Sequence, residues 1–472
     1  MLKNHIKALL HKNLTFTATH CQSRLIDGIS ECISHADKDR IILIRGFAGT
    51  GKTTMISSLT KSLLSVKIRS VLLAPTGRAA KVMSGYTGMP AYTIHKKIYR
   101  QQSSADGMGK FVLDRNLHTN TFFIIDEASM ISNGNGDSLV FGSGRLLDDL
   151  YEYVCSGFNC RLIITGDTAQ LPPVGINVSP ALDQFTLGGY GTEVKVFELT
   201  DVVRQASDSG ILSCATQIRN MISGGNSKGF IKLDISSFTD IERISGEELA
   251  ENLSLCYEKH GVYETTVITR SNKRANLYNN GIRNSILFRE DQISRGDLLM
   301  IVKNNYYWKD DDGRLDFIAN GDIGEIVTIY GYEELYGFHY ADICLRLIDY
   351  EDMELDCKIF LDTLSIDTAS FSVAQNRKLI DSVSEDYIEI NNKQKRWEKI
   401  RNNPYFNALQ VKYAYALTCH KAQGGQWKSV FVDHGYLVEG MVDNEFYRWL
   451  YTAFTRSVEK LYLVNFQPAF FE

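Results

Sequence analysis

The chain has 472 residues, 44% hydrophobic and 23% charged, with a net charge of −5. This composition predicts a globular protein of about two to four domains and excludes a uniformly basic protein, so a nucleic-acid partner would need a local groove of positive charge. Nine scattered cysteines without a C-x-x-C pair favour reduced thiols over a disulfide framework. Without a membrane-length apolar run or a signal-peptide pattern, we expect a cytoplasmic location and no membrane partner.

The first part of the chain alternates strand-like and helix-like segments. Residues 14–30 predict a short linker and a first helix, and apolar runs predict strands at 41–44, 71–74, 122–125 and 161–165. Alternation of this kind is typical of a parallel sheet covered on both faces. Loops that bind ligands then lie at the carboxyl ends of the strands.

Two regions interrupt this alternation. The polar residues 97–121 predict a small inserted hairpin with Phe111 near its centre. Residues 297–363 contain short β runs divided by turns, which predict a small barrel or sandwich. A charged stretch follows at 376–403, and alternating patterns return at 411–417 and 429–433.

Residues 46–53 follow the first apolar run and match the phosphate-binding pattern G-x-x-x-x-G-K-[ST]. Lys52 would reach the β- and γ-phosphates, and Thr53 would bind Mg²⁺. A glycine-rich turn with a chance lysine is disfavoured, because strand, loop and helix follow in the required order. The expected nucleotide contacts are Gly46, Ala48, Gly49, Thr50, Gly51, Lys52, Thr53 and Thr54.

Polar residues follow two later strands. Asp126 and Glu127 come directly after 122–125, where Asp126 would hold Mg²⁺ through water and Glu127 would polarise the attacking water. A solvated turn would be the better explanation if the pair stood alone, but the phosphate loop upstream favours the catalytic interpretation. Gln170 begins a proline-stiffened loop after 161–165 and is a candidate sensor of the γ-phosphate, although a rigid turn with an incidental glutamine is the alternative.

Transfer of a phosphoryl group needs positive charge beyond Lys52 and Mg²⁺, which arginine fingers supply. Arg204 and Arg456 are candidates. Most arginines only solubilise a surface, so their assignment depends on the order of motifs along the chain.

That order resembles the superfamily 1B DNA helicases of the RecD-like and Dda-like branch, from about residue 14 to the C-terminus. The segments that carry the resemblance are Gln22, the loop at 46–53, Thr76-Gly77-Arg78, Thr93-Ile94-His95, Asp126-Glu127, 166–175, Arg204-Gln205, 416–424 and 451–456.

The resemblance implies an α/β fold with two RecA-like P-loop domains, a small β-hairpin insertion and an SH3-like β-barrel insertion. The first RecA-like domain would span 1–200, with a strand-separating pin at about 97–121. The second would combine 201–296 with 411–472. The barrel domain would occupy 297–410, and no role is assigned to its residues 365–408.

The resemblance also assigns roles to residues. Gln22 would read the adenine, and Gly424 would contribute to the nucleotide site. The residues expected along the DNA are Thr76, Arg78, His95, Thr418, His420 and Lys421.

The implied activity is a motor that uses ATP and Mg²⁺ to move 5′ to 3′ on single-stranded DNA and to unwind duplex at single-strand/double-strand junctions. A single-strand-binding protein or a repair complex would be a further partner, and RNA stays open as a substrate. The main alternative is a DNA-stimulated ATPase subunit of a larger recombination or repair nuclease complex. A P-loop kinase or GTPase is disfavoured, because no N-K-x-D element follows a strand.

Overall fold

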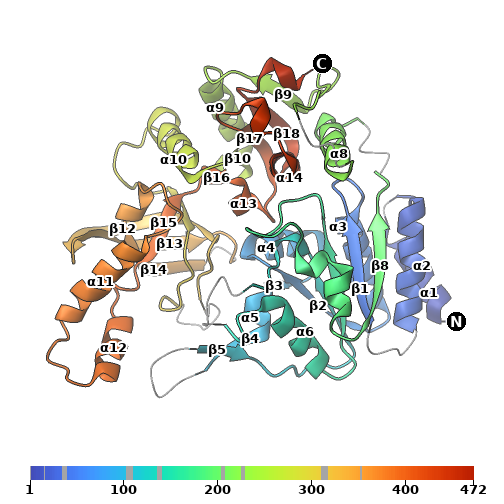
Figure 1. Ribbon diagram of the computed structural model, residues 1–472, viewed down its shortest axis with the longest axis horizontal. Helices are drawn as coiled ribbons and strands as arrows, with labels where there is room; N and C mark the ends of the chain where they lie inside the picture. The colour runs from blue at the N-terminus through green and yellow to red at the C-terminus, as the bar shows by residue number, and fades with distance from the viewer. Residues whose placement is uncertain are drawn as a thin grey trace.

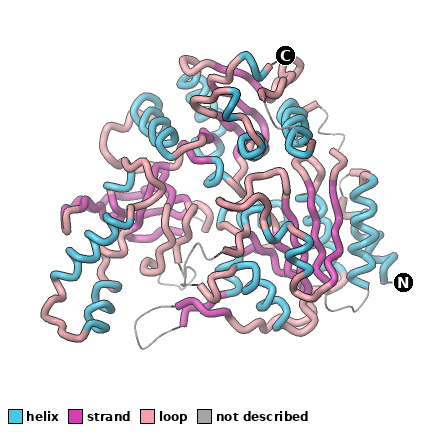
Figure 2. Tube along the Cα trace, viewed as in Figure 1, coloured by secondary structure: helices cyan, strands magenta, loops and turns pink. Residues whose placement is uncertain are grey.

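The computed structural model contains two parallel sheets, a closed barrel and a hairpin (Figures 1 and 2). It describes residues 2–14, 16–34, 40–102, 110–134, 141–202, 208–224, 229–309, 317–350 and 353–471. Within these ranges, no helix is both long enough and apolar enough to cross a membrane. The predicted α/β class with a hairpin and a barrel insertion is confirmed.

The first sheet has six parallel strands in the order β3-β2-β6-β7-β1-β8. Its central strands are apolar and fully buried, as expected for a sheet covered on both faces. The four predicted strands are confirmed, and β3 and β8 are additional. The strands are β1 (Arg40–Gly46), β2 (Arg69–Ala74), β3 (Ala91–Thr93), β6 (Thr121–Ile125), β7 (Arg161–Gly166) and β8 (Glu193–Leu199).

Helices cover this sheet on both faces (Figure 1). One of them, α1, was not predicted; it packs against α2 and α3 through the buried Ile6 and Leu10. The helices are α1 (Leu2–Lys12), α2 (His20–Ser34), α3 (Lys52–Ser65), α4 (Gly77–Thr87), α5 (Ile94–Ile98), α6 (Leu146–Ser156) and α7 (Gln184–Gly188).

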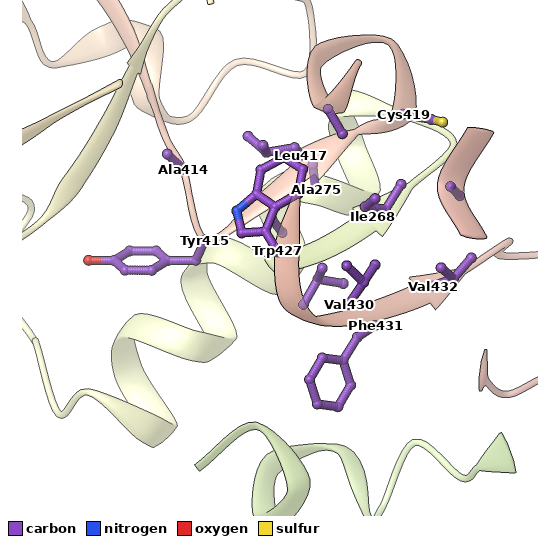
Figure 3. Packing of buried hydrophobic residues seen from close by; sticks show 14 of the residues in the cluster. Ile268, Ala275, Ala414, Tyr415, Leu417, Cys419, Trp427, Val430, Phe431 and Val432 are labelled. Atoms are coloured by element: carbon purple, nitrogen blue, oxygen red, sulfur yellow. The ribbon is translucent and has the colours of Figure 1, made fainter. Parts of the chain in front are cut away.

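The second sheet has five parallel strands in the order β16-β10-β17-β18-β9. Figure 3 shows apolar side chains from β10, β16 and β17 packed together, including Ile268, Leu417 and Val430. The strands are β9 (Ile241–Ile244), β10 (Thr265–Thr269), β16 (Ala416–Thr418), β17 (Trp427–Asp433) and β18 (Ser457–Val464). The helices are α8 (Gly210–Ser223), α9 (Leu249–His260), α10 (Asn272–Gly281), α13 (Cys419–Ala422) and α14 (Asn444–Phe454).

The barrel is inserted between β10 and β16 of the second sheet. It closes in the order β11-β12-β13-β14-β15, with bounds β11 (Leu298–Ile301), β12 (Ile323–Leu335), β13 (Phe338–Leu347), β14 (Met353–Phe360) and β15 (Leu409–Tyr413). Because β15 pairs with β11 and β14, the expected domain boundary at residue 410 falls inside a barrel strand. Between β14 and β15, α11 (Val373–Glu385) and α12 (Lys393–Arg401) form an arm that projects away from the sheets (Figure 1).

The predicted hairpin consists of β4 (Tyr99–Gln102) and β5 (Lys110–Leu113). Its aromatic residue Phe111 is only 3% exposed. The ring packs against Phe141, Tyr306 and Phe317, with centroid distances of 4.8, 5.1 and 6.0 Å. Phe111 therefore joins the hairpin to residues before β12 of the barrel and does not present a free aromatic wedge.

Candidate functional site

The phosphate loop connects β1 to α3 at the carboxyl end of the first sheet. Gly49 and Gly51 have positive φ angles of 73° and 81°, which glycine adopts without a steric penalty. A Cβ atom at Gly46 would lie 2.6 Å from Cγ of Lys52. The glycines are therefore required by the shape of the loop, and the loop directs the N-terminus of α3 toward the place where a phosphate would bind.

Lys52 and Thr53 open α3. The Lys52 ammonium donates to the carbonyls of Gly46 at 2.6 Å and Phe47 at 3.0 Å, and it lies 3.8 Å from Oδ2 of Asp167. Thr53 is exposed in the first turn of the helix, and Thr54 follows half-buried. The Lys52 ammonium thus lies over the loop with the exposed Thr53 beside it in sequence, and their contacts with phosphate and metal stay a prediction.

Asp126 and Glu127 follow β6. The Asp126 carboxylate accepts hydrogen bonds from Tyr86 Oη at 2.7 Å and Thr165 Oγ1 at 3.3 Å. A carboxylate and a threonine hydroxyl are oxygen donors of the kind that Mg²⁺ takes, since Mg²⁺ uses few protein ligands and completes its shell with substrate phosphates and water. Asp126 and Thr53 are the residues that would hold it.

Glu127 adopts a left-handed backbone conformation with φ of 54°, a strain that proteins retain mainly at functional sites. Burial raises the pKa of the Glu127 carboxyl, while the positive charge of Arg456 lowers it. A carboxylate with a raised pKa is a stronger base, which suits activation of a water molecule.

The loop after β7 carries Asp167 and Gln170. Asp167 is 1% exposed and accepts hydrogen bonds from the Ala169 N–H at 2.9 Å and from Tyr451 Oη at 2.7 Å. Oε1 of the buried Gln170 accepts from Ser129 Oγ at 3.5 Å, which joins this loop to the loop after β6. This bond connects Gln170 to the loop that follows Asp126 and Glu127, and its role as a γ-phosphate sensor stays a prediction.

The second sheet contributes Tyr451 from α14 and Arg456 from the residues just after that helix. The Ala48 N–H of the phosphate loop donates to Tyr451 Oη at 2.8 Å. The buried Arg456 guanidinium donates to the carbonyls of Thr452 and Gly425 at 3.2 and 3.3 Å. The other predicted finger, Arg204, lies outside the described residues.

Gln22 is fully buried beside the phosphate loop. Its Nε2 donates to the Thr50 carbonyl at 2.9 Å, and its Oε1 accepts from the Thr19 N–H at 3.0 Å. Gln22 therefore stabilises the phosphate loop through its backbone. Contact with an adenine stays a prediction.

Two predicted DNA residues of the first sheet, Thr76 and Arg78, lie where α4 meets the segment after α13. Thr76 caps this helix by accepting from the Ala79 N–H at 3.2 Å. The Arg78 guanidinium stacks over the Trp427 ring at 3.9 Å. Gly424 has φ of 74°, and a Cβ atom there would lie 2.8 Å from Cβ of Ala79. The start of α4 is thus packed against the segment after α13, and Gly424 lies against α4 rather than at the phosphate loop.

The remaining candidates lie on other segments. Thr418 precedes α13, His420 is exposed, and Lys421 bonds the side chain of Asn320, just before β12 of the barrel. His95 lies half-buried with its ring 4.9 Å from that of Phe141. Their contact with DNA stays a prediction.

Comparison with protein families gives two matches. Residues 32–232 match an AAA domain model, and residues 413–464 match the UvrD-like helicase C-terminal domain. The chain is 31% identical over 180 residues to the ATP-dependent RecD2 DNA helicase of Deinococcus radiodurans, covering 37% of this chain and 21% of that protein. It is 23% identical to the ATP-dependent DNA helicase dda of Enterobacteria phage T4, over 84% of this chain and 88% of that protein. The chain belongs to the superfamily 1B helicases.

Two further likenesses span nearly the whole helicase. An uncharacterised mimivirus protein, R530 of Acanthamoeba polyphaga mimivirus, is 22% identical over 89% of this chain and 94% of its own. A Bacteroides Pif1 helicase in complex with ADP-AlF3 and single-stranded DNA is 14% identical, with a TM-score of 0.47 over 97% of this chain and 95% of that one.

Three residues of this helicase's site were missed as functional candidates. Asp167 and Tyr451 stand within segments that carry the resemblance, but their motif positions do not reveal that they bond each other. Tyr86 is in α4 and Asp126 follows β6, and no motif marks Tyr86 as functional. A phenol that can reach a carboxylate is found only once α4 is placed beside β6.

Proposed function

We propose that this helicase uses ATP and Mg²⁺ to translocate 5′ to 3′ on single-stranded DNA and to unwind duplex DNA. The main support is the meeting of both sheets on the phosphate loop, where Tyr451 bonds Ala48 and the Arg456 charge acts on Glu127. Nucleotide turnover at such a shared site changes how two domains bind each other, which is the movement a motor requires.

The proposed DNA path crosses the contact between α4 and the segment after α13. It includes Thr76, Arg78 and His95 from the first sheet, and Thr418, His420 and Lys421 from the second. The RecD2 and Dda relatives are named as ATP-dependent DNA helicases, which supports DNA over RNA. The fork junction would lie near the hairpin β4-β5 and the barrel, which pack together through Phe111.

Forked duplexes with a single 5′ tail or a single 3′ tail test this proposal. We expect ATP-dependent unwinding of the 5′-tailed fork alone, and loss of both hydrolysis and unwinding in Lys52→Ala. A Lys52→Ala protein that kept the wild-type DNA-stimulated ATPase rate would overturn the assignment of the site. Hydrolysis without unwinding of either fork would instead favour a DNA-stimulated ATPase subunit of a larger recombination or repair nuclease complex.

A further inference from the structure

A tyrosine hydroxyl from the second sheet bonds directly to the phosphate loop. Tyr451 Oη accepts the Ala48 N–H at 2.8 Å and donates to Asp167 Oδ2 at 2.7 Å. The side chain is 1% exposed. Burial and the nearby Asp167 raise the pKa of the Tyr451 hydroxyl well above its usual value, so it remains a proton donor at neutral pH.

This hydroxyl lies on the side of the loop that a terminal phosphate would occupy. Lys52, whose ammonium reaches the β- and γ-phosphates in this motif, lies 3.8 Å from the same Asp167 oxygen that Tyr451 bonds. Asp167 also opens the loop that holds Gln170. Because an N–H group makes one strong hydrogen bond, a γ-phosphate oxygen at Ala48 and the Tyr451 hydroxyl compete for the same donor.

The helix that carries Tyr451 is also attached to the loop after β7. Arg448 donates to the Gln170 carbonyl at 3.2 Å, and the Leu171 N–H donates to Thr452 Oγ1 at 2.8 Å. On the phosphate loop itself, the Arg219 guanidinium of α8 lies 4.6 Å from the centre of the Phe47 ring. A change at Tyr451 would therefore be transmitted to α14 and the loop that it holds.

We propose that Tyr451 is a γ-phosphate-sensing residue that distinguishes ATP from ADP. Without nucleotide, its hydroxyl holds the second sheet on Ala48, and the γ-phosphate of ATP displaces it. ADP has no group to place there and leaves the Tyr451 bond intact. The displaced hydroxyl frees α14, and with it Arg456 just beyond the end of that helix, to adjust around the bound triphosphate.

This inference rests on the proposed ATP-dependent function and is tested by Tyr451→Phe, which keeps the buried ring and removes the hydroxyl. Tyr447→Phe is the matched control, because Tyr447 lies one turn earlier on α14 and its hydroxyl donates to the Gly229 carbonyl, away from the loop. Titration calorimetry with ATPγS and with ADP, each with Mg²⁺ and without DNA, measures both affinities.

We expect Tyr451→Phe to bind ATPγS about 3- to 10-fold more tightly than wild type, as removal of one competing hydrogen bond allows, and to bind ADP within about twofold. Tyr447→Phe should leave both affinities unchanged. Unchanged or weaker ATPγS binding by Tyr451→Phe, or equal tightening for ADP, would overturn the inference. Wild-type protein that bound neither nucleotide would overturn the proposed function itself.

Steady-state kinetics give a second readout that does not depend on the fraction of folded protein. The ratio of KM for ATP to the inhibition constant of ADP should fall severalfold in Tyr451→Phe and stay at the wild-type value in Tyr447→Phe. An unchanged ratio in Tyr451→Phe would show that the hydroxyl only stabilises the interface.

Discussion

The two parallel sheets have the same architecture but contribute to the site in different ways. In the first sheet, polar residues follow the carboxyl ends of β1, β6 and β7, where ligand sites of such sheets are usually found. In the second sheet, the contributing residues lie on α14 and just before β18 begins. Only the first sheet carries a phosphate loop, so a shared fold here does not mean a shared chemical role.

The two sheets therefore supply different residues of the candidate site. Lys52, Asp126 and Glu127, the proposed nucleotide-site residues, all follow strands of the first sheet. The side-chain hydrogen bonds of Lys52 and Asp126 are made with residues of that same part of the chain. Tyr451 and Arg456 arrive from the other sheet. Chemistry that needs both groups depends on the contact between the sheets, and chemistry that needs only the first group does not.

The largest effect is expected from removing the charge that the second sheet supplies. Arg456→Gln should lower kcat for ATP hydrolysis by about 10³-fold or more, as for other arginine fingers, while nucleotide affinity changes little. Single-turnover hydrolysis with saturating DNA measures this. Because Arg456 is buried and donates to two carbonyls, thermal unfolding of Arg456→Lys serves as the control for folding. Hydrolysis at the wild-type rate in Arg456→Gln would mean that the first sheet suffices.

A slightly smaller loss is expected from the first sheet's own base. Glu127→Gln removes the proton acceptor and keeps the shape of the side chain, so kcat should fall by about 10²- to 10⁴-fold with ATP still bound. Quenched-flow hydrolysis and nucleotide binding separate the two effects. A variant that lost binding together with hydrolysis would assign Glu127 to the nucleotide pocket and not to the chemistry.

Glu127 and Arg456 together should set the pH dependence of ATP hydrolysis. Burial raises the pKa of Glu127, so hydrolysis should fall, as pH is lowered, at a pH above the ordinary glutamate value of about 4.3. Arg456 lowers that pKa, so its removal in Arg456→Gln should move the acid limb to higher pH, whereas Arg456→Lys keeps the charge and should move it less. Profiles of kcat/KM against pH for the three proteins measure the shift. An identical acid limb in all three proteins would mean that the Arg456 charge does not affect the pKa of Glu127.

Long apolar runs made much of the fold predictable from sequence. The strands β1, β2, β6 and β7 each contain a continuous run of buried apolar residues, and the barrel runs are divided by clear turns. Shorter or mixed elements were missed: β3 has three residues, β8 is partly exposed along most of its length, and β14 alternates at its start. In the amphipathic helix α1, only Ile6 and Leu10 mark the buried face.

The site was predictable where a motif fixed the chemistry, as for Lys52, Asp126 and Gln170. It was not predictable where function depends on two distant segments meeting. Tyr451 and Ala48 are 403 residues apart, and Tyr86 and Asp126 are 40 apart. A tyrosine in a helix is usually a packing residue, and only the folded chain shows which hydroxyl reaches a carboxylate or a phosphate loop.

A moderate effect should come from Tyr86, which links α4 to Asp126, the proposed metal ligand. Its hydroxyl donates to Asp126 Oδ2 at 2.7 Å, so Tyr86→Phe should raise the Mg²⁺ concentration for half-maximal hydrolysis by about 10-fold, as for other groups that orient a metal ligand. Tyr99→Phe is the control, since its hydroxyl bonds Asp149 and not Asp126. Equal Mg²⁺ dependence in Tyr86→Phe and wild type would mean that Tyr86 does not orient Asp126 for metal binding.

The smallest effect on hydrolysis is expected where the two sheets touch near the proposed DNA path. Gly424→Ala places a methyl group 2.8 Å from Cβ of Ala79 and forces alanine to a φ of 74°, which costs about 1–2 kcal/mol of folding free energy. Gly435→Ala, with φ of 70° and only Arg274 nearby, has the same backbone cost without touching the first sheet. Urea unfolding should therefore show a loss of stability in both, larger in Gly424→Ala by the cost of relieving the contact with Ala79.

The two variants should differ in their response to DNA. Only Gly424→Ala displaces α4, so only this variant should need severalfold more single-stranded oligonucleotide for half-maximal ATPase stimulation, with hydrolysis at saturating DNA close to wild type. Parallel oligonucleotide titrations measure this difference. If both glycine variants needed equally more DNA, the effect would come from lost stability in the second sheet. The contact between Gly424 and Ala79 would then not couple the DNA path to the ATP site.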